Sequence, residues 1–407
     1  NIPASLKSIE AYAFEYSGLE TFTLPYIEDL AVGNYVFRYS DLQSVTIAEG
    51  YTAIPNYTFQ HCESLTEVNL PESLEWIGSY VFSGCTALET IDIPANVVNL
   101  CTITTSTLSS SSIGYVFDGC TSLRSVNFLG NKVEHIGTYT FRGTTALESI
   151  SLPASLQTLG NYAFTASGLK SMVVDGSYLG TYTFKDSEAL ESIEFTENVT
   201  TIPSYTFQNC SALKSVTIPA SVTNVATYAF SGSAVEKVVV LSKEITFGTY
   251  VFKGCESLVS VDFPADMTSL TLGSYMFDSC TALKTIRLPE ALTAIPTYIF
   301  QYSGLTAIEI PGSVETIGTY AFRDCTSLVS VNLGNVETIS ASAFIGCTSV
   351  RSIVIPRSVS SVLGSAFSGW TSAQTINIVG RPYDVAQLWN NAWATGCQAK
   401  IVWNYAA

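Results

Sequence analysis

The sequence predicts a repeat solenoid, a right-handed coil of about 16 turns that is mostly β-strand and loop. Three observations support this fold class. The motif Tyr-x-Phe recurs along most of the chain, most copies are 22 to 23 residues apart, and in most copies a short alternation of apolar and polar residues ends at a proline. A unit of about 23 residues cannot bury its Leu, Ile and Phe side chains alone, so each copy must cover the next.

The phenylalanine of Tyr-x-Phe sets the register of the repeat. Around it the pattern reads C/S-x-x-L-x-x-[IV]-x-[IL]-P-x-x-[LV]-x-x-I-G-x-Y-x-F. Most copies follow the period, but the spacing before Phe184 is 20 residues, which we expect to pinch the coil locally. The 16 copies are Phe14, Phe37, Phe59, Phe82, Phe117, Phe141, Phe164, Phe184, Phe207, Phe230, Phe252, Phe277, Phe300, Phe322, Phe344 and Phe367.

Each period is expected to contain one short strand. Segments such as LTEVNLP (65–71) and LKSVTIP (213–219) alternate apolar and polar residues and are rich in β-branched side chains. Connections of constant length make successive strands parallel. The glycine of Ile-Gly becomes proline at Pro55, Pro203 and Pro296, so that turn cannot require a left-handed residue, and we expect glycine to serve close approach there.

The signature L-x-x-[IV]-x-[IL]-P … I-G-x-Y-x-F-x-x-C resembles the BspA-like leucine-rich repeats of bacterial and protist surface proteins. The resemblance implies a leucine-rich-repeat coil with a parallel β-sheet on its concave face and short turns on its convex face. It also implies secretion or display at the cell surface, and a role in attachment or recognition in place of chemistry.

The predicted domains are a solenoid over residues 1–373 and a C-terminal cap over 374–407. Residues 3–6 match the middle of a repeat, so we expect the natural protein to extend upstream, with a signal peptide, a cap or a further domain. A Ser/Thr-rich insertion at 101–112 is expected to form a loop. In the cap, a helical stretch over roughly 383–395 precedes a strand, and its tryptophans are expected in the core: Trp389, Trp393 and Trp403.

Composition argues against several classes of function. A net charge of −16 with only 18 Lys and Arg residues disfavours nucleic acid as a partner. No Gly-x-Gly, Gly-x-Ser-x-Gly, Cys-x-x-Cys or His-x-x-x-His motif occurs, and the two histidines, His61 and His135, occupy unrelated repeat positions. We therefore expect no cofactor, no metal site and no enzymatic activity. No apolar run is long enough to span a membrane.

Eight of the ten cysteines fall three residues after the repeat phenylalanine, at a position that other copies fill with Ser or Thr. A site that accepts Cys or Ser needs a small, buried, weakly hydrogen-bonding side chain. We expect free thiols there, with Cys101 and Cys397 too far apart in repeat order to pair.

Two surfaces are candidate binding sites. The first is the outward side of the strands, where Asp262, Arg287 and Glu309 also fit a simple cross-strand charge ladder. The second is the stripe of tyrosines two residues before the phenylalanine, which also fits a purely structural ladder. The candidates on the strands are Asp92, Glu194, Asp262, Arg287 and Glu309; those in the stripe are Tyr139, Tyr162, Tyr182, Tyr205, Tyr228 and Tyr250.

The sequence therefore supports two functions. In the first, the chain is a non-enzymatic extracellular binding or adhesion module that recognises a protein or a glycan through the solenoid surface. In the second, it is a structural spacer or self-assembling stalk element of a larger cell-surface protein.

Overall fold

A computed structural model describes residues 2–101, 113–175, 179–381, 389 and 392–406. The chain is a parallel β-solenoid, as predicted, and its described residues contain no helix. It divides into two compact units, one of residues up to 196 with 209–212, the other of 197–208 with 213–407. The predicted loop at 102–112 and most of the predicted helical stretch at 383–395 lie outside the described residues.

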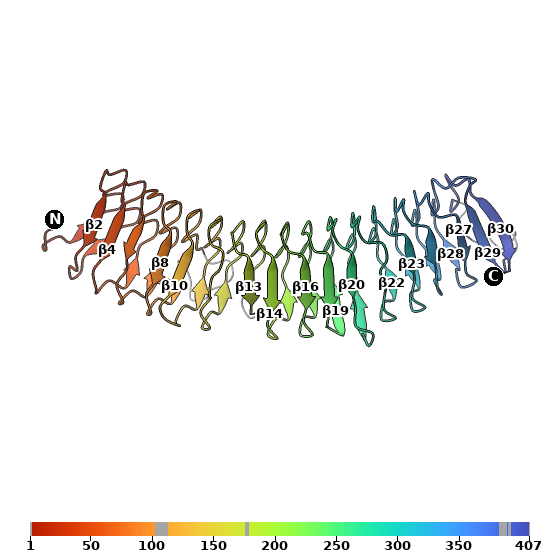
Figure 1. Cartoon of the computed structure of the whole chain (residues 1–407), viewed down its shortest axis with the longest axis horizontal. Helices are drawn as coiled ribbons and strands as arrows, with labels where there is room; N and C mark the ends of the chain where they lie inside the picture. The colour runs from red at the N-terminus through yellow and green to blue at the C-terminus, as the bar shows by residue number, and fades with distance from the viewer. Residues whose placement is uncertain (1, 102–112, 176–178, 382–388, 390–391, 407) are drawn as a thin grey trace. The chain divides into compact units, whose positions relative to one another are not determined.

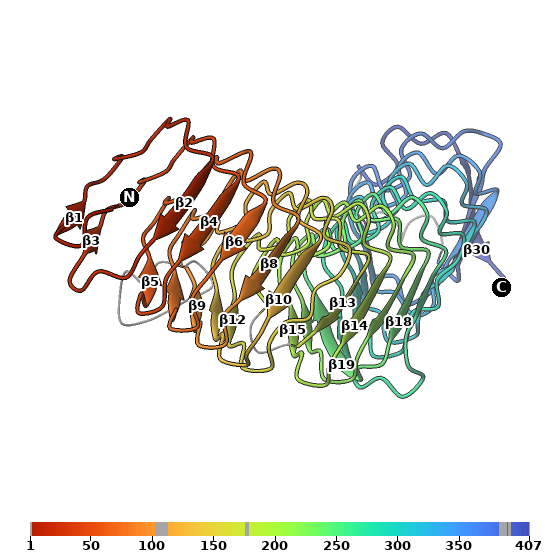
Figure 2. The same ribbon diagram turned by 60° about the vertical axis from the view of Figure 1, so that its left-hand side comes forward.

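Unit 1 contains two rows of parallel strands, which Figure 2 shows one below the other. The first row is β2 (Thr21–Leu24), β4 (Ser44–Ile47), β6 (Glu67–Asn69), β8 (Thr90–Ile93), β10 (Ser125–Phe128), β13 (Ser171–Val174) and β14 (Ser192–Phe195). The second row is β1 (Ser8–Ile9), β3 (Ala31–Val32), β5 (Ala53–Ile54), β7 (Trp76–Ile77), β9 (Asn99–Leu100), β11 (His135–Ile136) and β12 (Thr158–Leu159).

Unit 2 repeats the arrangement, and Figure 1 shows β16 and β20 of its first row. That row is β16 (Ser215–Ile218), β18 (Lys237–Val240), β20 (Ser260–Asp262), β23 (Ala307–Glu309), β25 (Ser330–Asn332), β27 (Ser352–Ile355), β29 (Thr375–Val379) and β30 (Lys400–Tyr405). The second row is β15 (Thr201–Ile202), β17 (Asn224–Val225), β19 (Glu244–Phe247), β21 (Ser269–Thr271), β22 (Ala294–Ile295), β24 (Thr316–Ile317), β26 (Thr338–Ile339) and β28 (Ser361–Val362).

The second row of strands was not predicted. Its members are mostly two residues long, and most of them end at an isoleucine, leucine or valine, at the position that precedes glycine in the Ile-Gly copies of the repeat. Two residues are too few for an alternation to show in the sequence, although the inward residue is buried in almost every copy. The prediction of one strand per turn was therefore wrong, and each complete turn is held by two sets of ladder bonds.

The repeat phenylalanines form the centre of the core in each unit. Their rings stack on those of the next turn with centroids 5.1 to 5.7 Å apart in unit 1 and 5.0 to 5.9 Å apart in unit 2. Phe230, for example, is completely buried. Continuous stacking of this kind is the shared core that the repeat period predicted.

The residue two before each repeat phenylalanine, a tyrosine in 14 of the 16 copies and Ser342 or Ser365 in the other two, adopts a left-handed backbone with φ between 55° and 63°. This conformation costs an L-residue about 1–2 kcal/mol. Ring stacking on the next turn, about 0.5–1.5 kcal/mol, and a backbone bond offset that cost; Tyr228 N, for example, donates to Thr249 O at 3.1 Å. The sequence pattern gave no sign of this conformation, because the residue is not glycine.

The glycines of Ile-Gly have no positive φ, and close approach explains them, as expected. A Cβ on Gly137 would lie 2.6 Å from the Cα of Gly114, and one on Gly318 would lie 2.7 Å from Thr297 N. Successive turns therefore touch through their backbones at this point.

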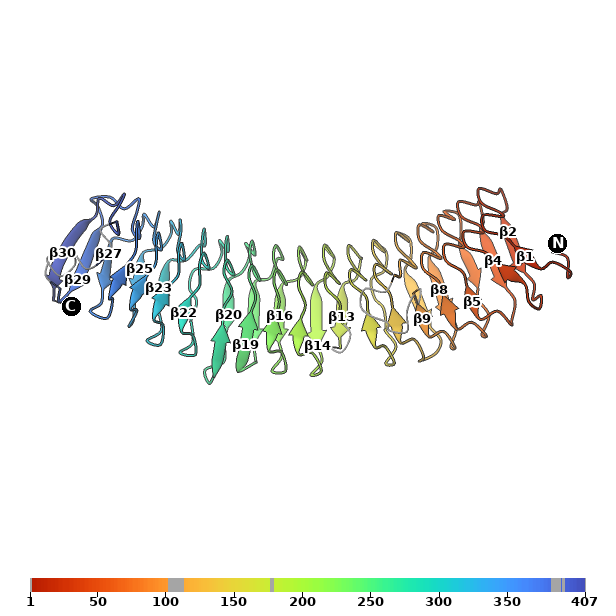
Figure 3. The same cartoon turned by 180° about the vertical axis from the view of Figure 1, so that it is seen from behind.

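The predicted strand of the C-terminal cap is β30, which pairs with β29 at the end of unit 2 (Figure 3). Trp389 and Trp393 are buried, as expected, and their rings meet edge to face with centroids 5.5 Å apart. Trp403 is half-buried. Residues 392–396, which overlap the predicted helical stretch, form a turn.

Candidate functional site

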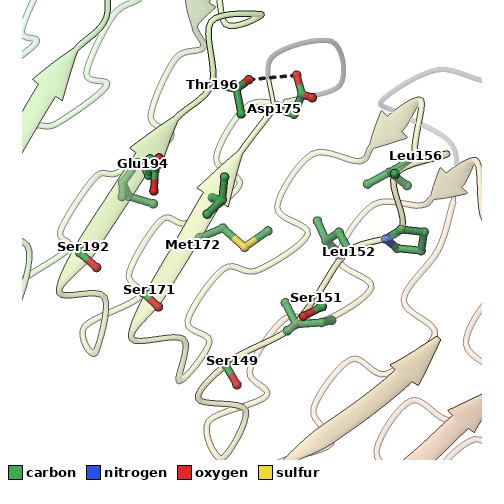
Figure 4. Close-up of a pocket in the computed structure, with 15 residues that line it drawn as sticks. Ser149, Ser151, Leu152, Leu156, Ser171, Met172, Asp175, Ser192, Glu194 and Thr196 are labelled. Atoms are coloured by element: carbon green, nitrogen blue, oxygen red, sulfur yellow. Dashed lines mark hydrogen bonds between the residues drawn. The ribbon is translucent and has the colours of Figure 1, made fainter. Parts of the chain in front are cut away.

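A hollow of about 700 Å³ lies on the first row of strands in unit 1, across residues 149–154, β13 and β14 (Figure 4). Its volume falls in the range of ligand-binding sites, about 300–1,000 Å³. Most of the apolar side chains lie toward the core, whereas Val173 is exposed on the outward side together with the polar ones. The apolar set is Ile150, Leu152, Pro153, Ala154, Leu156, Met172, Val173 and Ile193; the polar set is Ser149, Ser151, Ser171, Ser192, Asp175, Glu194 and Thr196.

The hollow coincides with a break in the first row of strands. Residues 147–153 read LESISLP, which matches the strand pattern, yet 148–152 form no strand. β10 on one side pairs only with β8, and β13 on the other pairs only with β14, among the described residues. In the described part, the backbone hydrogen bond between this segment and the residues that lead into β13 is donated by Lys170 N to Glu148 O, at 3.0 Å. The strand that should close the sheet here is thus missing.

The core is partly accessible at the break, as it also is at Val68 and Leu70 in the first row. Ile150, Leu152 and Ile193 are half-buried. Their counterparts in unit 2, Val216 and Ile218, are 2% and 0% exposed. In Figure 4 the Met172 side chain extends from β13 toward Leu152. Inward side chains that are covered in a regular turn therefore form an apolar floor here.

The sequence that follows β13 has a shorter connection than other turns. Four residues separate Val174 from Leu179, whereas six separate Ile218 from Val225. Regular turns place a buried Leu or Val in this stretch, such as Leu156 or Val222, but the short turn reads Asp-Gly-Ser-Tyr. The spacing of 20 residues therefore lacks one aliphatic residue of the repeat; residues 176–178 lie outside the described part, and the expected pinch stays a prediction.

The polar side of the hollow is acidic. Glu194 is exposed on β14, and Asp175 accepts a hydrogen bond from Thr196 Oγ1 at 3.1 Å. Just outside the lining, Lys170 Nζ lies 2.7 Å from Glu148 Oε2. The hydrogen bond and charge of Lys170 lower the pKa of Glu148. The nearby lysine is thus already paired, and the lining itself contains no Lys or Arg.

Of the five acidic and basic candidates on the strands, Glu194 lines the hollow and the others lie apart from it. Asp92 on β8 accepts a hydrogen bond from Asn127 at 2.7 Å. Asp262 on β20 pairs with Lys237 at 3.2 Å. Arg287 lies exposed in a second stretch, 284–288, that forms no strand, and Glu309 is exposed on β23.

The expected charge ladder of Asp262, Arg287 and Glu309 does not form. Among the described residues the ion pair of Asp262 is with Lys237, on the preceding strand β18, and no ion pair includes Arg287 or Glu309. Arg287 lies in a stretch that forms no strand, which the alternating pattern could not reveal.

The tyrosine stripe forms stacked rings, with centroids 4.3 to 4.8 Å apart in unit 1 and 4.4 to 4.9 Å apart in unit 2. In such a stack each interior ring covers its neighbour's face, so what it offers to a ligand is its edge and hydroxyl. Burial, and next the charge of Tyr182, raise the pKa of Tyr162 to about 12. The stripe therefore presents neutral hydroxyls, not flat platforms.

Cationic side chains cover parts of this stripe. Arg142 lies 5.6 and 4.9 Å from the ring centroids of Tyr115 and Tyr139, while it also forms a two-pronged pair with Asp118. Lys253 lies 5.4 Å from the Tyr250 centroid. These contacts are typical of a structural ladder whose cations are engaged within the protein.

The cysteine ladder consists of free thiols, as expected, and all ten cysteines are unbridged. Each ladder thiol donates to the carbonyl of the phenylalanine one turn earlier, as Cys255 Sγ does to Phe230 O at 3.1 Å. Ser187 makes the same bond to Phe164 O at 2.8 Å, which explains why the position accepts either residue. Burial raises the pKa of Cys255 to about 11, so the thiol stays protonated and is a poor nucleophile.

The described residues contain no group of three or more His, Cys, Asp or Glu side chains placed to hold a metal ion. Among them, no helix has the length and apolar character to cross a membrane.

Sequence reasoning missed most of the hollow. It selected Glu194 and noted the short spacing, but it did not select Leu152, Met172 or Asp175. The available signal was the absence of a Leu or Val between Val174 and Leu179. That absence shows which turn lacks an inward side chain, although it does not show that the neighbouring strand opens.

Comparisons with known proteins agree with this fold. The family model for the BspA type leucine rich repeat region matches residues 1–104, 110–236, 177–303 and 245–374. A leucine-rich repeat protein from Bacteroides ovatus is similar in structure over 94% of this chain and 92% of that chain, with 24% identity and a TM-score of 0.69. Another, from Eubacterium ventriosum, is 25% identical over 81% of this chain and 82% of that one, with a TM-score of 0.49.

No curated protein sequence matches the chain. At 24% identity the Bacteroides structure shows the fold, and the family match covers well over half of the sequence. Leucine-rich repeats of this family are generally non-enzymatic. The chain therefore belongs to the BspA-type leucine-rich repeat family.

Proposed function

We propose that the chain is a non-enzymatic binding module, secreted or displayed at the cell surface, that recognises a protein or a glycan through the first row of strands in unit 1. The hollow is the centre of the contact. The observation that carries the proposal is the break at 148–152, where a regular sheet opens and half-buried Ile150, Leu152 and Ile193 line a space of about 700 Å³. Apolar floors with a few placed polar groups are typical of binding sites.

Two further observations support this assignment. Sheet surfaces of repeat proteins commonly bind partners, and elsewhere in unit 1 the first row carries small exposed polar residues that offer no apolar anchor. The second is that the hollow's carboxylates, Glu194 and Asp175, are not balanced by a Lys or Arg in the lining. They would favour partners that carry neutral or positive groups.

A binding screen tests the proposal. The 407-residue protein is passed at physiological salt over immobilised matrix proteins and glycans, and each saturable hit is repeated with the double variant Ser171→Arg and Glu194→Lys. Both residues are exposed, so the fold should survive. We expect the double variant to weaken the hit by about tenfold or more, because it fills the hollow and reverses its charge.

The matched control is Ser215→Arg with Thr217→Lys, which places the same two side chains at the equivalent strand positions of β16, a strand that is paired with β18. The control should bind as the unchanged protein does. A partner whose binding both double variants weaken equally would show that it does not bind at the hollow. A folded protein without any saturable hit would favour the spacer function instead.

A further inference from the structure

We infer that the hollow binds an extended peptide segment, which pairs with the free edge of β13 and places alternate apolar side chains on the floor and basic side chains against Glu194 and Asp175. This inference rests on the proposed function and names the chemical class of its partner.

The first step concerns the backbone of β13. β18 shows how a first-row strand is paired on both sides, with β16 and with β20. β13 is paired with β14, and its other edge faces residues 149–152. Within the described residues, no backbone hydrogen bond joins 149–152 to β13 or to β10. An unpaired strand edge is a template for another extended chain.

The second step concerns the floor. Successive side chains of an extended peptide point to opposite faces, so every second one would face the core. The inward residues there are Leu152, Met172 and Ile193, and Figure 4 shows Met172 directed toward Leu152. An incoming Val, Ile or Leu would cover surface that the missing strand leaves accessible. Burying one such side chain contributes about 1.5–3 kcal/mol.

The third step concerns charge and ring chemistry. Glu194 and Asp175 lie on the outward side, where the alternate side chains of the peptide would point. Lysine or arginine at those positions would pair with them, whereas acidic groups would be repelled. None of the residues that line the hollow is aromatic, so the site lacks the flat faces on which a sugar would stack. A peptide of alternating apolar and basic residues fits all three observations.

The test uses a fluorescently labelled octapeptide of alternating valine and lysine, titrated with the whole 407-residue protein and followed by fluorescence anisotropy. Three comparison peptides isolate the three steps. The first is methylated on every second backbone nitrogen to block strand pairing, and it is made in two versions, one methylated at the valines and one at the lysines. The second replaces valine by serine, and the third replaces lysine by glutamate. We expect each to bind at least about tenfold more weakly than the parent, since each loses two or more contacts.

The protein variants locate the site. The double variant Ser171→Arg and Glu194→Lys should lose binding of the parent peptide, while Ser215→Arg with Thr217→Lys should keep it. Binding that ignores backbone methylation, or that survives the first double variant, would overturn the inference. If a screened partner depends on the hollow but the parent peptide neither binds nor competes with it, the inference fails and the proposed function stands. If nothing depends on the hollow, both fail.

Discussion

Two segments of this chain have nearly the same pattern and different structures. LKSVTIP (213–219) contains β16, which pairs with β18, whereas LESISLP (147–153) forms no strand and lies beside the hollow. In both segments the apolar residues are directed inward. The difference shows that alternation decides which side chains face the core, while it does not decide whether the segment pairs as a strand.

The largest expected difference between the segments is in core packing. Ile218→Ala should lower the free energy of unfolding by about 2–5 kcal/mol, because Ile218 is fully buried. Leu152→Ala, at the equivalent position, should cost only about 1 kcal/mol, because Leu152 is half-buried and borders an existing space. Urea titration of both variants measures this, and equal costs would mean that the hollow is closed in solution.

Amide hydrogen exchange should separate the same segments without any mutation. The amides of β16 and β18 take part in strand pairing, whereas those of 149–152 make no such bonds in the described structure. We expect exchange at Ile150 and Leu152 to be at least about a hundredfold faster than at Val216 and Ile218. Similar protection would show that the sheet is continuous and would remove the basis for the peptide site.

The hydrogen-bond ladder beneath the phenylalanines should, in contrast, be equal in the two regions. Cys255→Val and Ser187→Val each leave a buried phenylalanine carbonyl without its donor. Each should cost about 1 kcal/mol or somewhat more. Cys255→Ser keeps the donor and should cost less than Cys255→Val. If urea titration showed a large difference between the two valine variants in the loss of unfolding free energy, the irregularity would not be confined to the first row of strands.

The smallest expected effect is a pH dependence close to the hollow. Partial burial lowers the pKa of His135, whose Nδ1 lies 2.9 Å from Thr158 Oγ1. The unfolded chain therefore binds the proton more readily, so the contribution of His135 to stability is present above about pH 6.5 and is lost as the pH falls below it.

His135→Asn places at this position the residue that regular turns have at Asn99 and Asn224. It should reduce the loss of melting temperature between pH 7.5 and 5.5 by about 1 °C, because the effect comes from the protonation of a single partly buried ring. An unchanged or steeper loss in thermal unfolding would show that other groups carry the pH dependence.

Much of the fold could be predicted from the sequence because each feature repeats. The spacing of Phe207, Phe230 and Phe252 predicted the stacked core, and the exchange of Cys for Ser predicted free thiols. The second row of strands could not be recognised, because two residues such as Ala53 and Ile54 show no period. The left-handed tyrosines could not be recognised either, because their conformation is fixed by contacts between turns.

Less of the candidate site could be predicted, since it arises from a failure of the repeat. Glu194 was selected by its outward position alone. Leu152 matches the consensus, so its accessibility depends on its neighbours and not on its own identity. An inference from the pattern treats every turn alike, and a break in pairing between two turns has no residue that marks it.

The hydrogen-bonded thiols have a consequence for the conditions under which this chain folds. Cys255 and its counterparts stabilise the coil as neutral donors, and none of the ten cysteines forms a covalent bridge. Assembly of the core therefore requires neither an oxidant nor an isomerase, and adding a reductant removes no cross-link. The same coil is thus available in a reducing and in an oxidising compartment, on either side of an envelope.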